Sequence, residues 1–216
     1  MRKLILKMSI TLDGFVGGPN GEIDWIFKSM SEDAVTWTVD KIEQAGAHLM
    51  GRKTFNDMAA YWPNSSEVFA KSMNEIPKIV FSKKGFDPAQ KGESTAALKD
   101  AIRVNRANGK NIVSSLPVSA TTWAEAKVIS GDLVAGITDL KKQDGKPLVA
   151  HGGASFAQDL VQTGLIDEFC LLKHPVAIGK GLGLFAGIKI PMYLKLIETK
   201  TFSAGAVAHI YRSERS

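Results

Sequence analysis

Three short segments place glycine, hydroxyl or cationic side chains directly after an apolar run that can form a strand. Glycine lets the backbone turn closely beside a ligand, and the amide groups of a following helix N-terminus favour an anionic phosphate. Each segment alone also fits a capped helix or an exposed basic turn, whereas the combination predicts one extended nucleotide that crosses several strand ends. The segments are Gly51-Arg52-Lys53-Thr54, Phe81-Ser82-Lys83-Lys84 and His151-Gly152-Gly153-Ala154-Ser155-Phe156.

The two cationic clusters, at 52–53 and 83–84, are separate in the sequence. Two such clusters suit a dinucleotide with an additional phosphate, which favours NADPH over NADH. The glycine pair at 152–153 lacks the Gly-x-Gly-x-x-Gly spacing of a Rossmann domain. The cofactor is therefore expected on another α/β scaffold.

Strands and helices must alternate along the chain to position these segments. Apolar runs predict strands at 3–10, 47–50, 76–82, 126–129, 147–150 and 166–176, a further one at 111–115, and two between 192 and 212. Helical spacing and capping residues predict helices at 31–46, 54–60, 94–108, 132–142 and 155–163. This alternation predicts one three-layer α/β domain with a mostly parallel sheet and an antiparallel C-terminal edge.

Length and composition are those of a globular protein. The chain has 216 residues with 44% hydrophobic and 23% charged residues, which fits a single domain. The net charge of +5 comes from scattered lysines and arginines, so an anionic small molecule is favoured over nucleic acid as a partner.

Cysteine, histidine and hydropathy patterns exclude several other classes. The single cysteine, Cys170, lies in an apolar run, which fits a reducing compartment and a buried structural thiol. The four histidines lack metal-ligand spacing, so no metal is predicted. Because no apolar run approaches the roughly 18 residues of a membrane span, we expect a cytoplasmic protein without a membrane partner.

Ordered motifs along nearly the whole chain resemble the dihydrofolate reductase superfamily, and within it the bacterial branch similar to the reductase domain of riboflavin biosynthesis. The motifs are Ser9-Ile10-Thr11-Leu12-Asp13-Gly14-Phe15, Pro19-Asn20-Gly21 with Asp24-Trp25, Leu49-Met50-Gly51-Arg52-Lys53-Thr54-Phe55, Pro77-Lys78-Ile79-Val80-Phe81-Ser82, Trp123 with Lys127-Val128-Ile129, Lys146-Pro147-Leu148-Val149-Ala150-His151-Gly152-Gly153, Gly164-Leu165-Ile166-Asp167-Glu168, and His174-Pro175-Val176-Ala177-Ile178-Gly179 with Leu184-Phe185.

The resemblance implies a sheet of about eight strands with NADPH across its carboxyl edge. It implies that Arg52, Lys53, Ser82 and Lys83 hold the adenosine 2′-phosphate. It also implies that Thr54 and the amides of Gly152, Gly153, Ala154, Ser155 and Phe156 hold the pyrophosphate, with Gly51 in the same cofactor site. The backbone near Val16 and Gly17 would flank the nicotinamide. The riboflavin branch reduces the ribose of a phosphoribosylamino-pyrimidine, and the resemblance further implies a homodimer.

The source of the proton is left open by the sequence. Dihydrofolate reductases use a carboxylate a few residues after the tryptophan matched by Trp25, and the stretch 28–31 has none. This departure argues against dihydrofolate as the natural substrate. The candidate acids are Asp13, Asp24 and Glu168, whose alternative roles are a turn, a helix cap and an ion pair. Trp25 and Trp62 are candidates to stack on a flat substrate ring, or else pack in the interior.

Two further features leave alternatives open. The segment at about 86–122 is longer than the connection usual in the family, and we interpret it as an insertion in the single domain 1–216. Without a clear acid, a nucleotide-binding protein that performs no turnover is the alternative to an NADPH-dependent reductase of a pteridine, pyrimidine or phosphoribosylamino-pyrimidine. Nucleic-acid binding is the weakest hypothesis.

Overall fold

A central sheet of eight strands organises the computed structural model, which describes residues 1–90, 95–108 and 122–214. The strand order is β4-β3-β2-β5-β1-β6-β8-β7. The strands are β1 (Leu4–Ile10), β2 (Ala47–Gly51), β3 (Lys78–Phe81), β4 (Lys127–Ile129), β5 (Leu148–Ala150), β6 (Glu168–Lys173), β7 (Leu194–Thr201) and β8 (Val207–Ser213).

The pairing is parallel from β4 through β6, and β8 is antiparallel to both β6 and β7. The predicted mostly parallel sheet with an antiparallel C-terminal edge is confirmed. Ala150 on β5 is in register with Leu6 on β1 and with Leu49 on β2. The segments that follow β2, β3 and β5 therefore emerge at one edge of the sheet, which we call the carboxyl edge.

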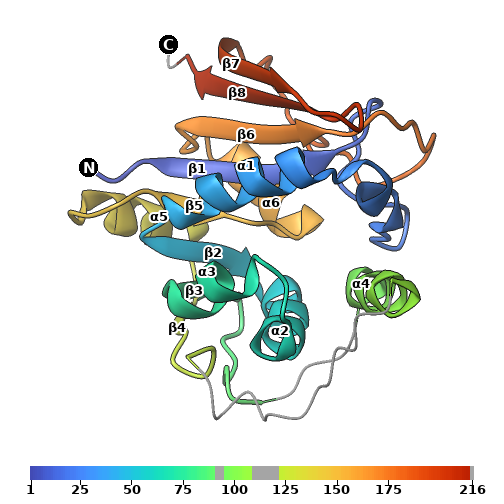
Figure 1. Ribbon diagram of the computed structural model, residues 1–216. Coiled ribbons are helices and arrows are strands. Elements are labelled where there is room, and N and C mark those ends of the chain that lie inside the picture. Colours follow the sequence, from blue (N-terminus) through green and yellow to red (C-terminus); the bar gives the residue numbers. More distant parts are fainter. Residues whose placement is uncertain (91–94, 109–121, 215–216) are drawn as a thin grey trace.

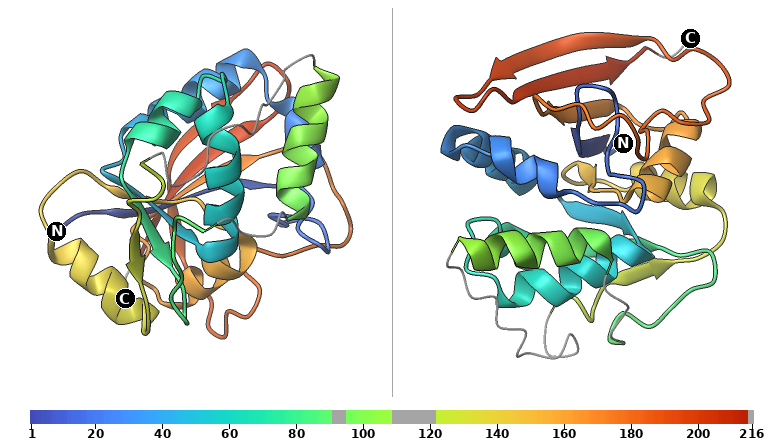
Figure 2. Two further views of the ribbon diagram at one scale, coloured as in Figure 1. Left: turned by 90° about the horizontal axis from the view of Figure 1, so that it is seen from below. Right: turned by 90° about the vertical axis from the view of Figure 1, so that its right-hand side faces the viewer.

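Helices cover both faces of the sheet (Figure 1), and the right-hand view of Figure 2 shows the sheet between its two helical layers. One layer holds α1, α2 and α3, and the other holds α5 and α6. The α-helices are α1 (Glu32–Glu43), α2 (Arg52–Tyr61), α3 (Ala70–Glu75), α4 (Ala96–Ala107), α5 (Leu133–Lys142) and α6 (Ala154–Gln162), and the 3-10 helices are η1 (Asp24–Ser29) and η2 (Trp62–Asn64).

Alternation along β1 divides the core between the two faces. Leu4 and Leu6 are fully buried in the cluster that faces α5 and α6, whereas Lys7 lies on the α1 side beside Cys170 of β6. The α1 side holds two further clusters, which include Trp37 of α1 and Phe55 of α2. The buried Cys170 belongs to one of them, as the sequence predicted for a structural thiol.

The structure differs from the sequence prediction mainly in short elements. The helices η1, η2 and α3 were not predicted, because segments of three to six residues give little helical periodicity. The strands predicted at 76–82 and 166–176 are shorter, at β3 and β6. Ser31 precedes α1 but donates to Asp33 rather than capping the helix. The strand predicted at 111–115 lies outside the described residues.

No helix within the described ranges is long and apolar enough to cross a membrane. Among the same residues, no three histidine, cysteine, aspartate or glutamate side chains gather into a group that could hold a metal ion.

Candidate active site

The N-termini of two helices meet at the carboxyl edge. Helix α2 begins after Gly51 at the end of β2, and α6 begins after Gly153, which follows the neighbouring strand β5. Neither helix receives a side-chain hydrogen bond at its N-cap, since glycine has no side chain to provide one. The first amide groups of both helices therefore remain available to an anion, and the helix dipoles favour negative charge there.

Direct contacts join the two N-termini. The Gly51 amide donates to the Gly152 carbonyl at 3.4 Å, and the Gly153 amide donates to the Thr54 hydroxyl. A Cβ atom at Gly51 would lie 3.0 Å from that of Phe156. The Gly152–Gly153 peptide is cis, and Gly152 has a φ of +83°. Residues that lie about a hundred positions apart in the sequence thus form one cradle.

Cationic side chains flank this cradle. Arg52 and Lys53 are exposed on the first turn of α2, and Ser82 and Lys83 follow the adjacent strand β3. The Lys83 side chain is 89% exposed, and its Nζ lies 3.8 Å from a carboxylate oxygen of Asp159 on α6. The predicted phosphate-binding cations therefore lie next to the two helix N-termini.

The loop that holds Val16 and Gly17 follows β1 at the same edge. The Val16 side chain is buried in the core, so only the Val16 backbone is available for contacts outside the core. The Val16 amide donates to the Leu182 carbonyl at 2.9 Å, and the Leu182 amide donates to the Gly17 carbonyl at 2.8 Å. These bonds fix the loop to the glycine-containing segment 179–187.

Gly181 leaves no room for a side chain beside this loop. A Cβ atom there would lie 2.3 Å from the Gly17 carbonyl oxygen, and backbone cannot move aside as a flexible side chain can. We expect Gly181→Ala to lower the free energy of unfolding by roughly 1–3 kcal/mol, measured by urea denaturation. Gly183→Ala is the control, because the nearest atom to its Cβ is 3.8 Å away. Equal stability of the two variants would contradict the packing argument.

Asp13 holds a turn rather than presenting a free acid. Its carboxylate accepts from the Thr11 hydroxyl at 2.6 Å and from the amides of Ile178 and Gly179 at 3.0 and 2.8 Å. The Thr11 hydrogen bond and then the backbone amides lower the pKa of Asp13. The group is therefore ionised at neutral pH and lacks a proton to donate, which supports the alternative role in a turn.

The other two candidate acids lie in different places. Asp24 starts η1, is exposed, and pairs with Arg103 of α4 at 3.4 Å. Glu168 is the first residue of β6, where it pairs with Lys3 at 2.7 Å and lies 3.8 Å from Arg212. Because a parallel strand starts at the edge opposite its end, Glu168 is separated from the cradle. We therefore remove Glu168 from the candidate site.

The two tryptophans proposed to stack on a substrate both make interior contacts. Trp25 is only 7% exposed, its Nε1 donates to the Glu22 carbonyl, and its ring lies edge-on to that of His174. Trp62 is partly exposed and packs edge-on against the rings of Tyr61 and Phe69. Trp25 therefore has the alternative role of interior packing, whereas Trp62 keeps an exposed surface on which a ring could stack.

Helix α4 connects two elements at the carboxyl edge. An Asp100 carboxylate oxygen on α4 accepts from the Ile23 amide before η1 at 3.0 Å, and Thr95 at the helix N-cap bonds Asp57 of α2. Figure 2 shows α4 beside α2 when this edge faces the viewer. The part of the predicted insertion that the structure describes therefore ties η1 to α2.

The sequence analysis assigned no role to the histidine side chains: it found no metal-ligand spacing among them and used His151 and His174 only as members of motifs. His174 is fully buried after β6, and its Nδ1 lies 2.7 Å from the Ser29 hydroxyl. His151 Nε2 lies 2.8 Å from His48 Nδ1, although the two residues are 103 positions apart. No sequence signal identifies such a pair, because β2 and β5 become neighbours only in the folded sheet.

Comparison with known proteins identifies the family to which this chain belongs. Residues 2–208 match the RibD C-terminal domain family. The chain belongs to this family. It is 31% identical over 210 residues to the uncharacterized protein YyaP of Bacillus subtilis, and the match covers 97% of this chain and 94% of YyaP.

Two solved structures share the fold at lower sequence identity. One is a diaminohydroxyphosphoribosylaminopyrimidine deaminase/5-amino-6-(5-phosphoribosylamino)uracil reductase from Thermotoga maritima, with a TM-score of 0.62, 17% identity, and coverage of 99% of this chain and 57% of that one. The other is dihydrofolate reductase from Enterococcus faecalis in complex with NADP(H), with a TM-score of 0.57, 13% identity, and coverage of 99% and 97%. The predicted dihydrofolate reductase-like fold is confirmed.

Proposed function

We propose that this chain is an NADPH-dependent reductase of a small nitrogen-containing ring compound, with a phosphoribosylamino-pyrimidine as the leading substrate class. Membership of the RibD C-terminal domain family supports the proposal. So do the names of two proteins with the same fold, of which one is a phosphoribosylaminouracil reductase and the other was solved with NADP(H).

The observation that carries the proposal is the pair of uncapped helix N-termini at Gly51 and Gly153. Two adjacent sets of free amides suit a pyrophosphate, which carries negative charge on both of its phosphorus centres. Arg52 and Lys83, beside this cradle, suit an additional phosphate at the adenosine end. The residues present therefore fit NADPH, which when bound supplies the hydride.

The chain's own residues orient the reactants. The backbone of Val16 and Gly17 positions the nicotinamide end, and the bonds to Leu182 keep that backbone in place. Trp62 and Asp24 remain the candidates for ring stacking and for proton supply, since Asp13 and Trp25 are engaged in structural contacts. The proposed site thus keeps one acid, which is paired with Arg103.

Cofactor titration followed by tryptophan fluorescence tests the proposal. We expect Arg52→Ala and Lys83→Ala each to weaken NADPH binding by about tenfold, as for an exposed charge-assisted hydrogen bond to phosphate. NADH binding should change little in either variant. Lys142→Ala is the control, since Lys142 is exposed on α5 and pairs with Asp139. Failure of the unaltered protein to bind either dinucleotide would contradict the proposal.

A nucleotide-binding protein without turnover is the second candidate function. The observation that favours it is the full engagement of Asp13 by three hydrogen bonds, with no proton left to give. The two functions are separated by NADPH consumption with 5-amino-6-(5-phosphoribosylamino)uracil and with dihydrofolate. Sustained consumption with either compound identifies a reductase, whereas tight NADPH binding without consumption favours the second function.

A further inference from the structure

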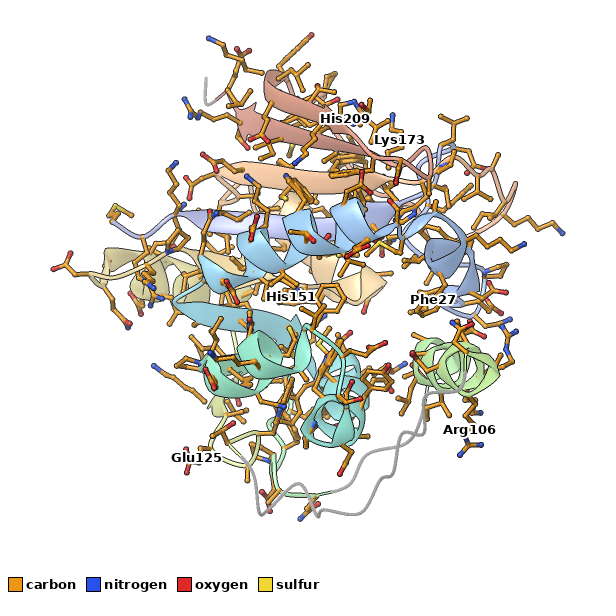
Figure 3. All side chains as sticks on the ribbon, in the orientation of Figure 1. Phe27, Arg106, Glu125, His151, Lys173 and His209 are labelled. Carbon is orange, nitrogen blue, oxygen red and sulfur yellow. The ribbon has the colours of Figure 1, made fainter. Side chains whose placement is uncertain are left out.

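A chain of hydrogen bonds leads from a backbone carbonyl to the residue before the glycine pair. His48 Nε2 lies 3.3 Å from the Ser72 carbonyl oxygen, and His48 Nδ1 lies 2.8 Å from His151 Nε2. Both rings lie on the sheet face that carries α1 and α3, with their centroids 4.6 Å apart. Figure 3 marks His151 where β5 ends, beside β2. Every bond in the chain constrains a proton position.

The carbonyl at one end fixes the direction of the whole chain. A carbonyl can only accept, so His48 Nε2 carries the proton and donates to Ser72. In a neutral ring the other nitrogen is then an acceptor, so His48 Nδ1 accepts and His151 Nε2 must donate. His151 Nδ1 is consequently left without a proton and presents a lone pair.

The rings stay neutral at physiological pH. Burial lowers the pKa of His48 to about 4, and burial also holds the pKa of His151 well below its usual range. The charge of Lys7 lowers both pKa values further, and Lys78 acts in the same direction on His48. A further positive charge on this face is therefore disfavoured, and both rings keep the neutral tautomers.

His151 Nδ1 remains open to a ligand. Within the described ranges it has no hydrogen-bond partner, and His151 is only partly buried. Three fully buried side-chain atoms of the described residues also have no hydrogen-bond partner, namely Trp37 Nε1, Thr38 Oγ1 and His174 Nε2. The strand β5 lies between β2, whose end carries Gly51, and β1, which leads to the loop at Val16. His151 therefore sits between the two proposed ends of the cofactor site.

We propose that His151 Nδ1 accepts a hydrogen bond from an N–H or amino group of the substrate ring, and that His48 and the Ser72 carbonyl determine this preference. The inference rests on the proposed function for the identity of the ligand, but its tautomer component does not. A lone pair in this position repels a carbonyl or carboxylate oxygen, so the site discriminates in favour of ring compounds that carry a donor there.

Ring-nitrogen NMR of the ¹⁵N-labelled protein at pH 7 tests the tautomers without any ligand. We expect both His48 and His151 to carry the proton on Nε2, with each of the four histidines assigned by a single histidine-to-glutamine variant. The variant His48→Phe removes the acceptor and should release His151 into a mixture of tautomers. The control Ser72→Ala keeps the carbonyl and should leave the tautomers unchanged. A proton on Nδ1 of His151 in the unaltered protein would overturn the inference.

A pair of uracils tests the specificity in the presence of NADPH. We expect 6-aminouracil to bind at least tenfold more tightly than 6-carboxyuracil, and to move the Nδ1 resonance of His151. His151→Leu should abolish this preference, whereas Ser72→Ala, which keeps the carbonyl, should retain it. Equal binding of the two uracils, or binding of neither, would overturn the specificity. If the unaltered protein does not bind NADPH, that result counts against the proposed function. The tautomers are tested separately, because the ligand-free spectrum does not depend on NADPH binding.

Discussion

Asp167→Ala is expected to lower the free energy of unfolding by roughly 3–5 kcal/mol, because it leaves a buried ammonium group without its counter-ion. Lys141 is 4% exposed, and its Nζ lies 2.5 Å from the Asp167 carboxylate. In the variant this group keeps the Leu165 carbonyl, which lies 2.8 Å away and carries only a partial charge. The Leu4 amide also loses the carboxylate as an acceptor. Urea denaturation at pH 7 measures the loss.

The exposed pair Lys142–Asp139 provides the matched control on the same helix. Its atoms lie 3.1 Å apart, with side chains 65% and 73% exposed. We expect Asp139→Ala to cost at most about 1 kcal/mol, since water replaces the lost partner. The double variant Lys141→Met, Asp167→Asn should recover part of the loss by removing the buried charge. A cost for Asp167→Ala no larger than that for Asp139→Ala would show that burial of Lys141 is not decisive.

Stability is expected to fall as the pH drops from about 6.5 to about 4, because His48, His151 and His174 stay neutral in the folded chain. Burial lowers the pKa of His48 and of His174 to about 4, and burial lowers that of His151 as well. Lys7 contributes to each of these shifts. Below pH 6.5, the ordinary histidine pKa, these side chains therefore bind protons in the unfolded chain but not in the folded chain.

For one histidine, a shift from 6.5 to about 4 corresponds to about 3 kcal/mol. Urea denaturation between pH 7 and pH 4.5 measures the decline, and His174→Gln should make it shallower because that variant has one fewer such group. The acids Asp13 and Asp33 have lowered pKa values, that of Asp33 being about 2. Much of their contribution to stability is therefore lost only below the pH range of this experiment. The pKa of Asp57 is raised by burial, which gives the opposite slope. A pH profile unchanged by His174→Gln would contradict the assignment.

The alternation of strands and helices, and the segments at the strand ends, could be predicted from local sequence signals. Apolar runs such as those before Gly51 and Gly152 are local signals, since burial in a parallel sheet demands continuous apolar residues. The glycine and cationic residues after these runs are local signals too, because a turn and a phosphate-binding segment each involve only a few consecutive residues. These features were enough to predict the fold class and the position of the candidate cofactor cradle.

Which side chains share an environment depends on strand order, and no local sequence signal predicts that order. Glu168 was a candidate acid alongside Asp13, but the parallel direction of β6 places Glu168 at the opposite edge, where it pairs with Lys3. His48 and His151 gave no local signal, because their contact depends on β2 pairing with β5 rather than with β1. Strand order is set by packing of the whole sheet, and hydrogen-bond partners across strands follow from that order.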